Sequence, residues 1–217
     1  MNDFNLNFKS IVKKYPNKIA LIDLDDTKHT YKKLDYSSDK IANFLNNKLS
    51  GEKIIAIDSK KNYKTILGFL GALKAHVTYF FLDLNQPKKR ILKIFKKTKV
   101  NYLITESKIK FFNITSISID KILKKDVKIN SFNKNYSSND LAYVMFTSGS
   151  TGEPKGAIIS HKNILNFVKW SKKNFLIKTK DVFSQVNPLY FDNSVFDLYN
   201  SLLNGSTSVL TDGLDIN

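Results

Sequence analysis

Short apolar runs alternate along the chain with longer segments in which apolar residues recur every three or four positions. The first such longer segment predicts a helix over residues 34–49 with one apolar face, formed by Ile41, Phe44, Leu45 and Leu49. Further helices are predicted at 63–74, from Pro87 onward, and at 161–175 and 192–203. Strands are predicted at 19–23, 53–58, 78–84, 101–105, 141–147, 156–160, 181–187 and 206–211. This alternation predicts an α/β fold with mostly parallel sheets flanked by helices.

Residues 107–139 interrupt the alternation with short strand-like pieces and a polar stretch at 130–139. A chain of 217 residues is long enough for one large domain or two small ones. We interpret the polar stretch as a connection within one domain, because regular elements of the same kind continue on both sides of it.

Composition narrows the classes of function. Apolar residues make up 42% and aromatic residues 12% of the chain, which is typical of a globular protein. The absence of cysteine excludes disulfides, thiolate catalysis and cysteine-based zinc sites, and the three histidines lack metal-ligand spacing. No signal peptide and no apolar run of about 20 residues is visible, so we expect a cytoplasmic protein without a membrane segment.

The formal net charge of +16 raises nucleic acid as a candidate partner. Arg90 is the only arginine, however, whereas base reading and bidentate phosphate contacts favour arginine. The lysines are spread over the whole chain, and the densest runs, at 88–90 and 96–97, fall on one predicted helix. We therefore expect a solvated helix face and no specific nucleic-acid binding.

Residues 141–161 read LAYVMFTSGSTGEPKGAIISH and place hydroxyls, glycines and one lysine between two apolar runs. Glycines allow sharp turns and close approach to a ligand, successive amides bind anions, and hydroxyls supply adjustable donors. Lys155, fixed behind Pro154, adds a positive charge. The segment matches neither the Walker A pattern nor the Rossmann glycine pattern. The alternatives are a phosphate-binding loop, a flexible linker, and a hairpin connection without a ligand.

The string from Thr147 to Gly156, TSGSTGEPKG, resembles the phosphate-binding motif T-S-G-S-T-G-x-P-K-G of the adenylate-forming (AMP-binding) superfamily at every fixed position. Two upstream segments agree with this resemblance: HTYKKL at 29–34, and LGALKA at 70–75 followed by Tyr79 and Asp83. The second departs from the family pattern, since His76 stands where the family usually has glycine and Leu82 where it usually has proline. We expect the turn at this position to be altered.

Residues 188–197, PLYFDNSVFD, form the second informative segment. Read locally, Asp192 is an N-cap of the helix that follows. Phe191-Asp192-x-Ser194 also resembles the F-D-x-S element of amino-acid-activating members, in which the aspartate pairs with the substrate's α-ammonium group. The wider wording is closest to D-alanine–carrier protein ligases and peptide-synthetase adenylation domains. The resemblance therefore implies substrate binding by Asp192 and Phe191.

The resemblance implies ATP-dependent activation of a carboxylic acid, in particular an amino acid, with Mg²⁺, and transfer to the phosphopantetheine thiol of a carrier protein or to coenzyme A. The implied contacts to the ATP phosphates are Thr147, Ser148, Gly149, Ser150, Thr151, Gly152 and Lys155. The resemblance further implies that residues 1–217 correspond to the N-terminal part of an AMP-binding domain, and we expect the rest of that domain and the lid domain to be missing from them.

No residue of the chain matches the catalytic lysine of the family's lid, so the catalytic residue is unknown. We expect weak nucleotide binding and no useful turnover from the chain alone, and a complementary C-terminal polypeptide as a partner. The alternatives are a fragment resembling acyl-CoA synthetases and a non-catalytic remnant that binds nucleotide or a carrier protein.

Overall fold

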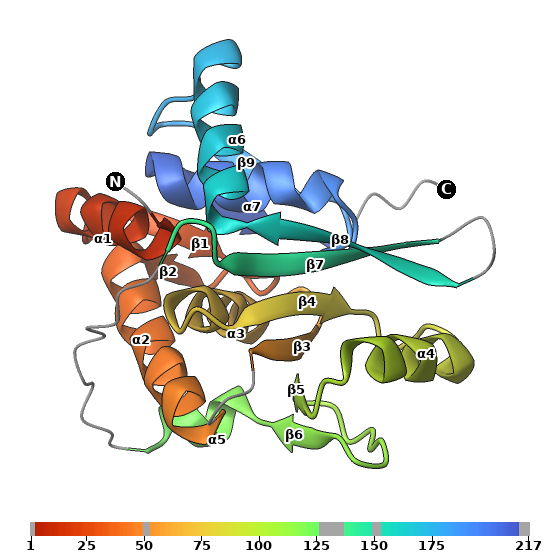
Figure 1. The fold of residues 1–217 in the computed structure, drawn as a ribbon. Helices are drawn as coiled ribbons and strands as arrows, with labels where there is room; N and C mark the ends of the chain where they lie inside the picture. Colours follow the sequence, from red (N-terminus) through yellow and green to blue (C-terminus); the bar gives the residue numbers. More distant parts are fainter. Residues whose placement is uncertain (1–2, 50–52, 126–136, 149–152, 213–217) are drawn as a thin grey trace.

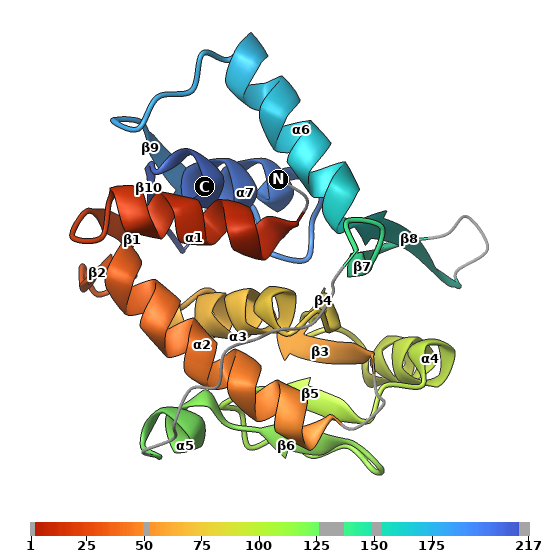
Figure 2. The ribbon, with the colours of Figure 1, turned by 60° about the vertical axis from the view of Figure 1, so that its left-hand side comes forward.

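A computed structural model describes residues 3–49, 53–125, 137–148 and 153–212 of the chain, which form two sheets and seven helices (Figures 1 and 2). The helices are α1 Phe4–Lys14, α2 Tyr31–Lys48, α3 Tyr63–Lys74, α4 Lys88–Thr98, α5 Ile119–Leu123, α6 His161–Asn174 and α7 Asn193–Asn204. The strands are β1 Ile19–Ile22, β2 Lys28–Thr30, β3 Ile54–Asp58, β4 Thr78–Leu82, β5 Tyr102–Ile104, β6 Thr115–Ile117, β7 Leu141–Ser148, β8 Pro154–Ser160, β9 Val182–Gln185 and β10 Thr207–Leu210. None of the described helices is long and apolar enough to cross a bilayer.

The two sheets are mostly parallel, which confirms the predicted fold class. The smaller sheet has the strand order β2-β1-β10-β9, and the larger has the order β6-β5-β3-β4-β7-β8. Among the strand pairs of the described residues, only β1–β2 and β7–β8 are antiparallel, and each of them lies at one edge of its sheet. Helix α3 joins the parallel pair β3–β4 and α7 joins the parallel pair β9–β10, as the alternation of the sequence predicts, whereas no helix lies between the parallel strands β5 and β6.

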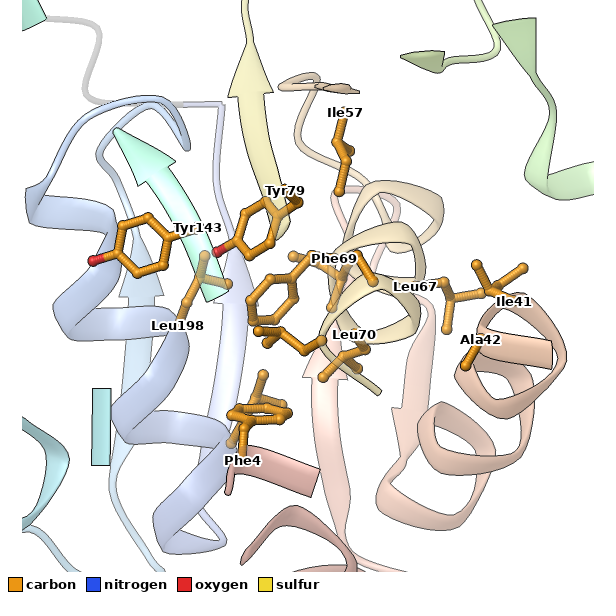
Figure 3. Close-up of a cluster of buried hydrophobic side chains, with 14 of the residues drawn as sticks. Phe4, Ile41, Ala42, Ile57, Leu67, Phe69, Leu70, Tyr79, Tyr143 and Leu198 are labelled. Atoms are coloured by element: carbon orange, nitrogen blue, oxygen red, sulfur yellow. The ribbon is translucent and has the colours of Figure 1, made fainter. Parts of the chain in front are cut away.

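Two hydrophobic cores hold these layers together. The larger core takes side chains from both sheets and from the helices between them, including Phe4 of α1, Phe69 of α3 and Leu198 of α7 (Figure 3). The smaller core lies between the opposite face of the six-stranded sheet and α4, where Phe80 of β4 packs with Ile94. The six-stranded sheet is therefore covered on both faces, as expected for parallel strands.

Most predicted elements agree with the structure to within three residues, and α3 agrees at both ends. Helix α2 begins at Tyr31, three residues before the predicted start, because the Thr30 hydroxyl accepts a hydrogen bond from the Lys33 amide and caps the helix. Helices α1 and α5 and strand β2 have no counterpart in the sequence prediction. Most of the polar stretch at 130–139 falls outside the described residues.

The turn after α3 keeps a left-handed backbone although glycine is absent. His76 follows the C-cap residue Ala75 and has a φ of 52°, a value that glycine adopts most easily. Its imidazole stacks on that of His161, with ring centroids 4.4 Å apart. Leu82, the second departure from the family pattern, is a buried residue at the end of β4.

Helices α2 and α3 approach closely at Gly71, and this contact gives a test of the core. A Cβ on Gly71 would lie 2.5 Å from Cγ2 of Ile41, so we expect Gly71→Ala to lower the free energy of unfolding by about 1–3 kcal/mol. Gly68→Ala, in the same helix, is the control, because its Cβ would meet its nearest neighbours, Cγ2 and Cδ1 of Ile104 and Cγ2 of Ile57, at 3.3, 3.4 and 3.7 Å. Urea unfolding of both variants is the measurement, and equal losses would contradict the close contact at Gly71.

Candidate functional site

Strands β7 and β8 form a hairpin that carries the described ends of the glycine-rich segment (Figure 1). Thr147 lies opposite Lys155, and the Thr147 hydroxyl lies 3.5 Å from the Lys155 carbonyl oxygen, to which it donates. The Lys155 side chain is exposed at this end of the hairpin. Residues Gly149, Ser150, Thr151 and Gly152, and the side chain of Ser148, lie outside the described part.

Two lysines of α4 contact the residues at the start of β8. The Lys93 ammonium pairs with the Glu153 carboxylate, which lowers the pKa of Glu153, and Lys97 Nζ donates to the carbonyl oxygen of Pro154 at 2.8 Å. Two lysines of α4 therefore contact Glu153 and Pro154, the two residues directly before Lys155. This arrangement adds positive potential beside the expected phosphate site.

A pocket of about 670 Å³ opens beside the base of the same hairpin. Its volume is within the range of sites for small organic ligands, and its lining is mostly apolar with a few polar groups. The lining residues come from β7, β8, α6, the segment between β9 and α7, and the start of α7, and they are Tyr143, Ile159, Asn163, Ile164, Phe167, Asn187, Asp192, Asn193, Val195, Phe196 and Asp197.

Asp192 lines this pocket and also caps α7. Its Oδ1 accepts a hydrogen bond from the Asn193 amide at 2.9 Å, so the local N-cap interpretation is confirmed. Capping does not remove the carboxylate from the pocket, and its charge acts on the Tyr143 phenol across the cavity. Burial first, and the negative charge of Asp192 second, raise the pKa of Tyr143 to about 12.

A second carboxyl group, that of Asp197, lines the pocket from α7. Burial raises the pKa of Asp197 to about 6, and the positive charge of Lys61 opposes part of that rise. The Lys61 ammonium is itself held by backbone carbonyl oxygens of Val186 at 2.9 Å and Thr211 at 3.0 Å. Asp192 and Asp197 therefore give the pocket two carboxyl groups, which favours a ligand with a cationic group.

Phe191, the second residue expected at the substrate, lies outside the set that lines the pocket. Its side chain is about half exposed and packs against Tyr190, with ring centroids 4.9 Å apart. Sequence reasoning did not identify Tyr143 or the residues of α6. A signal for Tyr143 exists, because Tyr143 and Thr147 are four residues apart in one strand and therefore share a face.

The described ends of the glycine-rich segment and part of the pocket wall lie along one hairpin. Tyr143 pairs with Ile159 beside the pocket, and Thr147 pairs with Lys155 near the tip. Four residues of strand separate these two pairs, which corresponds to roughly 13 Å. Together, these features place the exposed Lys155 at one end of a hairpin and a pocket with two carboxyl groups near its other end, on a parallel α/β scaffold.

Comparison with known proteins gives the family. Residues 8–216 match the family described as AMP-binding enzyme, and the chain belongs to this family. It is 30% identical over 214 residues to bacitracin synthase 3 of Bacillus licheniformis, covering 97% of this chain and 3% of that protein. It is 31% identical over 189 residues to a D-alanine–D-alanyl carrier protein ligase of Bacillus cytotoxicus, covering 84% of this chain and 38% of the ligase.

Solved structures agree on the fold. The N-terminal subdomain of Klebsiella oxytoca NpsA in complex with 3-hydroxybenzoyl-AMSN superposes with a TM-score of 0.87 at 23% identity. The match covers 97% of this chain and 54% of the NpsA chain, so this chain spans about half the length of that subdomain. The match also covers less than half of the D-alanine–D-alanyl carrier protein ligase.

Proposed function

We propose that this chain carries the ATP-phosphate and substrate-binding half of an enzyme that activates an amino acid as an aminoacyl adenylate. The activated acyl group would then pass to the phosphopantetheine thiol of a carrier protein. The observation that carries this proposal is Asp192, a carboxylate that lines the pocket while the cationic phosphate segment lies on the hairpin forming the pocket's wall.

The chemistry requires that two anions meet. A carboxylate oxygen of the amino acid forms a bond to the α-phosphorus of ATP, and the bond from that phosphorus to the pyrophosphate oxygen breaks. In this proposal Asp192 holds the α-ammonium group, which orients the substrate carboxylate. Lys155 and Thr147, with the neighbouring motif residues Ser148, Gly149, Ser150, Thr151 and Gly152, hold the β- and γ-phosphates and the departing pyrophosphate.

Mg²⁺ fits this proposal as an ion that arrives with the triphosphate. Within the described residues, no group of three or more histidine or acidic side chains is arranged to hold a metal ion. Mg²⁺ commonly keeps several waters and is bound by substrate phosphates with one or two carboxylates. Bound there, it would offset negative charge on the phosphate oxygens, while Lys155 supplies the protein's own positive charge.

The carrier protein and a completing polypeptide are the partners in this proposal. The D-alanine–D-alanyl carrier protein ligase is similar to this chain, and one solved NpsA chain with the same fold is artificially fused to a PCP domain. The chain spans about half of the NpsA subdomain. We therefore expect amino-acid activation only when the second half of an AMP-binding domain is supplied.

ATP–pyrophosphate exchange with a panel of D- and L-amino acids tests the function. We expect no useful exchange from the chain alone and amino-acid-dependent exchange from the completed domain. Asp192→Asn should lower kcat/KM for the amino acid by about 30-fold or more, which corresponds to roughly 2 kcal/mol for an unpaired ammonium group. Asparagine also caps helices well, so this substitution removes the charge without removing the cap.

The outcomes separate the candidate functions. An unchanged kcat/KM in Asp192→Asn, together with exchange on carboxylic acids that lack an amine, would favour an enzyme resembling acyl-CoA synthetases. Retained ATP binding without exchange in the completed domain would favour a non-catalytic remnant. Exchange by the isolated chain would contradict the expectation that this half is inactive alone.

A further inference from the structure

Two buried histidines meet where four segments of the chain come together. His76 follows the C-cap of α3 and His161 is the first residue of α6, and their imidazoles stack with ring centroids 4.4 Å apart and planes 14° apart. His76 Nε2 lies 3.9 Å from Asp3 Oδ2 at the start of α1, and His76 Nδ1 lies 3.4 Å from Asp140 Oδ2 directly before β7. Figure 2 shows the start of α1 beside the start of α6. His76 and His161, the histidine pair, therefore join α1, α3, α6 and the entry to β7.

His161 is buried without a hydrogen-bond partner for its ring nitrogens. The residue is 0% exposed, and neither Nδ1 nor Nε2 has a partner among the described residues. A neutral imidazole carries one N–H donor, so this donor is left unsatisfied, which is rare in folded proteins. A second proton would add a positive charge at the N-terminus of α6, where the helix dipole disfavours cations. The surroundings of His161 therefore favour the neutral imidazole.

The backbone of His76 adds a second cost at the same contact. Its φ of 52° lies in the left-handed region, which a residue other than glycine adopts only with strain. Glycine at this position would remove the strain, and it would also remove the stack on His161. A strained residue held by a specific side-chain contact is the kind of outlier that motivates a functional hypothesis.

Two carboxylates face the histidine pair, and both already bind backbone amides. Asp3 Oδ1 accepts a hydrogen bond from the Leu6 amide at 2.8 Å and caps α1, and Asp140 Oδ2 accepts one from the Ser137 amide at 3.0 Å. Among the described residues, Asp3, Asp140 and the two imidazoles themselves are the charged or titratable groups that act on the pair. A cation in the pair would attract the two carboxylates away from the cap of α1 and from the turn before β7.

The histidine pair is neutral at pH 7. Burial lowers the pKa of His76, and the charges of Asp3 and Asp140 oppose that shift. Burial first, and the positive charge of a protonated His76 second, lower the pKa of His161 to about 4. An unfolded histidine has a pKa of about 6.5, so below that pH the unfolded chain binds a proton that the folded chain does not. The stability of this contact therefore falls as the pH falls from about 6.5 towards the pKa of folded His161.

The histidine pair lies at one end of the pocket wall. Helix α6 begins at His161, and Asn163 and Ile164 in its first turn line the pocket. The His161 amide donates to the Asp140 carbonyl oxygen at 3.1 Å, so the start of α6 is attached to the segment that enters β7. Strand β7 carries Tyr143, which also lines the pocket. A change at the histidine pair therefore acts on two of the elements that form the pocket.

We propose that the histidine pair is an acid-sensitive joint: protonation of either imidazole separates the start of α6 from α3 and α1 and opens the wall of the pocket. A charged imidazole is unstable in a buried site, and water stabilises it once the contact has opened. The inference goes beyond the proposed function, because it holds whatever ligand the pocket takes.

Amide hydrogen exchange of the full chain at pH 7 and pH 5.5, corrected for the intrinsic effect of pH, measures the opening. We expect the opening equilibrium constant at the starts of α1 and α6 to rise roughly tenfold for each histidine that stays neutral in the closed state. The amides of β3 should change much less. Trp170, the only tryptophan, lies in α6 and gives a second readout, since acrylamide should quench its fluorescence more strongly at pH 5.5.

The double variant His76→Asn/His161→Phe should remove the rise, because neither new side chain titrates. Asparagine tolerates a left-handed backbone, and phenylalanine keeps a buried ring. His76→Asn alone should reduce the rise, and it serves as the test if phenylalanine at position 161 prevents folding. His29→Phe is the matched control, since His29 stacks on Tyr63, with ring centroids 3.7 Å apart, in another part of the fold and should leave the rise at α6 unchanged.

An equal rise in the wild type and in either variant of the pair would overturn the proposal. So would a rise as large in β3 as in α6, because it would show global unfolding in place of a local opening. Loss of the rise in His29→Phe would place the acid response elsewhere. The measurements need no ligand, so a failure of amino-acid activation would contradict the proposed function without affecting this result.

Discussion

Replacing Lys74 with alanine is expected to lower the free energy of unfolding by about 3–5 kcal/mol. The Lys74 side chain is fully buried, and its ammonium donates to Asp35 Oδ1 at 2.7 Å, Asp39 Oδ1 at 2.8 Å and the Asp35 carbonyl oxygen at 2.9 Å. All three ammonium donors are used. Burial lowers the pKa of Lys74, and the charges of Asp39 and Asp35 oppose that shift. Removing the ammonium leaves two carboxylates, 16% and 12% exposed, without their buried partner.

Lys9→Ala is the control for Lys74→Ala, because Lys9 binds the same two carboxylates from the surface. Its Nζ lies 2.9 Å from Asp35 and 2.6 Å from Asp39, but its side chain is 41% exposed, so we expect a loss of about 1 kcal/mol or less. Guanidinium chloride unfolding gives both values. If the two variants lose equal stability, the buried ammonium does not hold α2 against α3.

The contacts of Lys74 also explain the role of a motif that sequence analysis identified only by its resemblance to the family. The segment LGALKA at 70–75 places Gly71 against Ile41 of α2 and Lys74 beneath Asp35 and Asp39. These residues pack α3 against α2 and do not line the pocket. This family motif therefore marks a contact between two helices, and only the three-dimensional arrangement shows that it does not belong to the candidate site.

Element types were predictable where one pattern extended over a whole segment. Helix α3 is recognisable because its buried residues run without interruption from Thr65 to Lys74. Helix α1 was missed, although Asp3 caps it through the Leu6 amide and Phe4 and Phe8 are buried. Its Asn-rich sequence and an exposed Leu6 weaken the apolar periodicity, and the packing of the two phenylalanines decides its structure.

The candidate site was predictable only in part for a related reason. The phosphate segment and Asp192 belong to contiguous motifs, so their residue types and spacing carry the signal. The pocket instead joins Tyr143 of β7, Asn163 of α6 and Asn187 after β9, which are separated by 20 residues or more. These residues are brought together by the antiparallel pairing of β7 with β8 and by the packing of α6 on α7. No local sequence pattern specifies either contact.

Phe4→Ala is expected to lower the free energy of unfolding by about 3–5 kcal/mol, because it removes the ring that joins α1 to the larger core (Figure 3). The Phe4 ring is fully buried, stacks on Phe8 at 5.9 Å, and meets Phe69 and Tyr199 edge-on at 6.3 and 5.8 Å. These contacts connect α1 with α3 and α7, so the cavity left by alanine would lie where three helices meet. Urea unfolding measures the loss.

Leu6→Ala is the matched control for Phe4→Ala, since Leu6 lies in the same helix but is 57% exposed. We expect this control to change the stability by about 0.5 kcal/mol or less. Amide exchange in α1 adds a local measurement, because loss of the Phe4 contacts should speed exchange in α1 before it affects β3 or β4. A loss in Phe4→Ala no larger than that in Leu6→Ala would mean that α1 lies on the core without stabilising it, since the aromatic contacts of Phe4 are the main difference between the two sites.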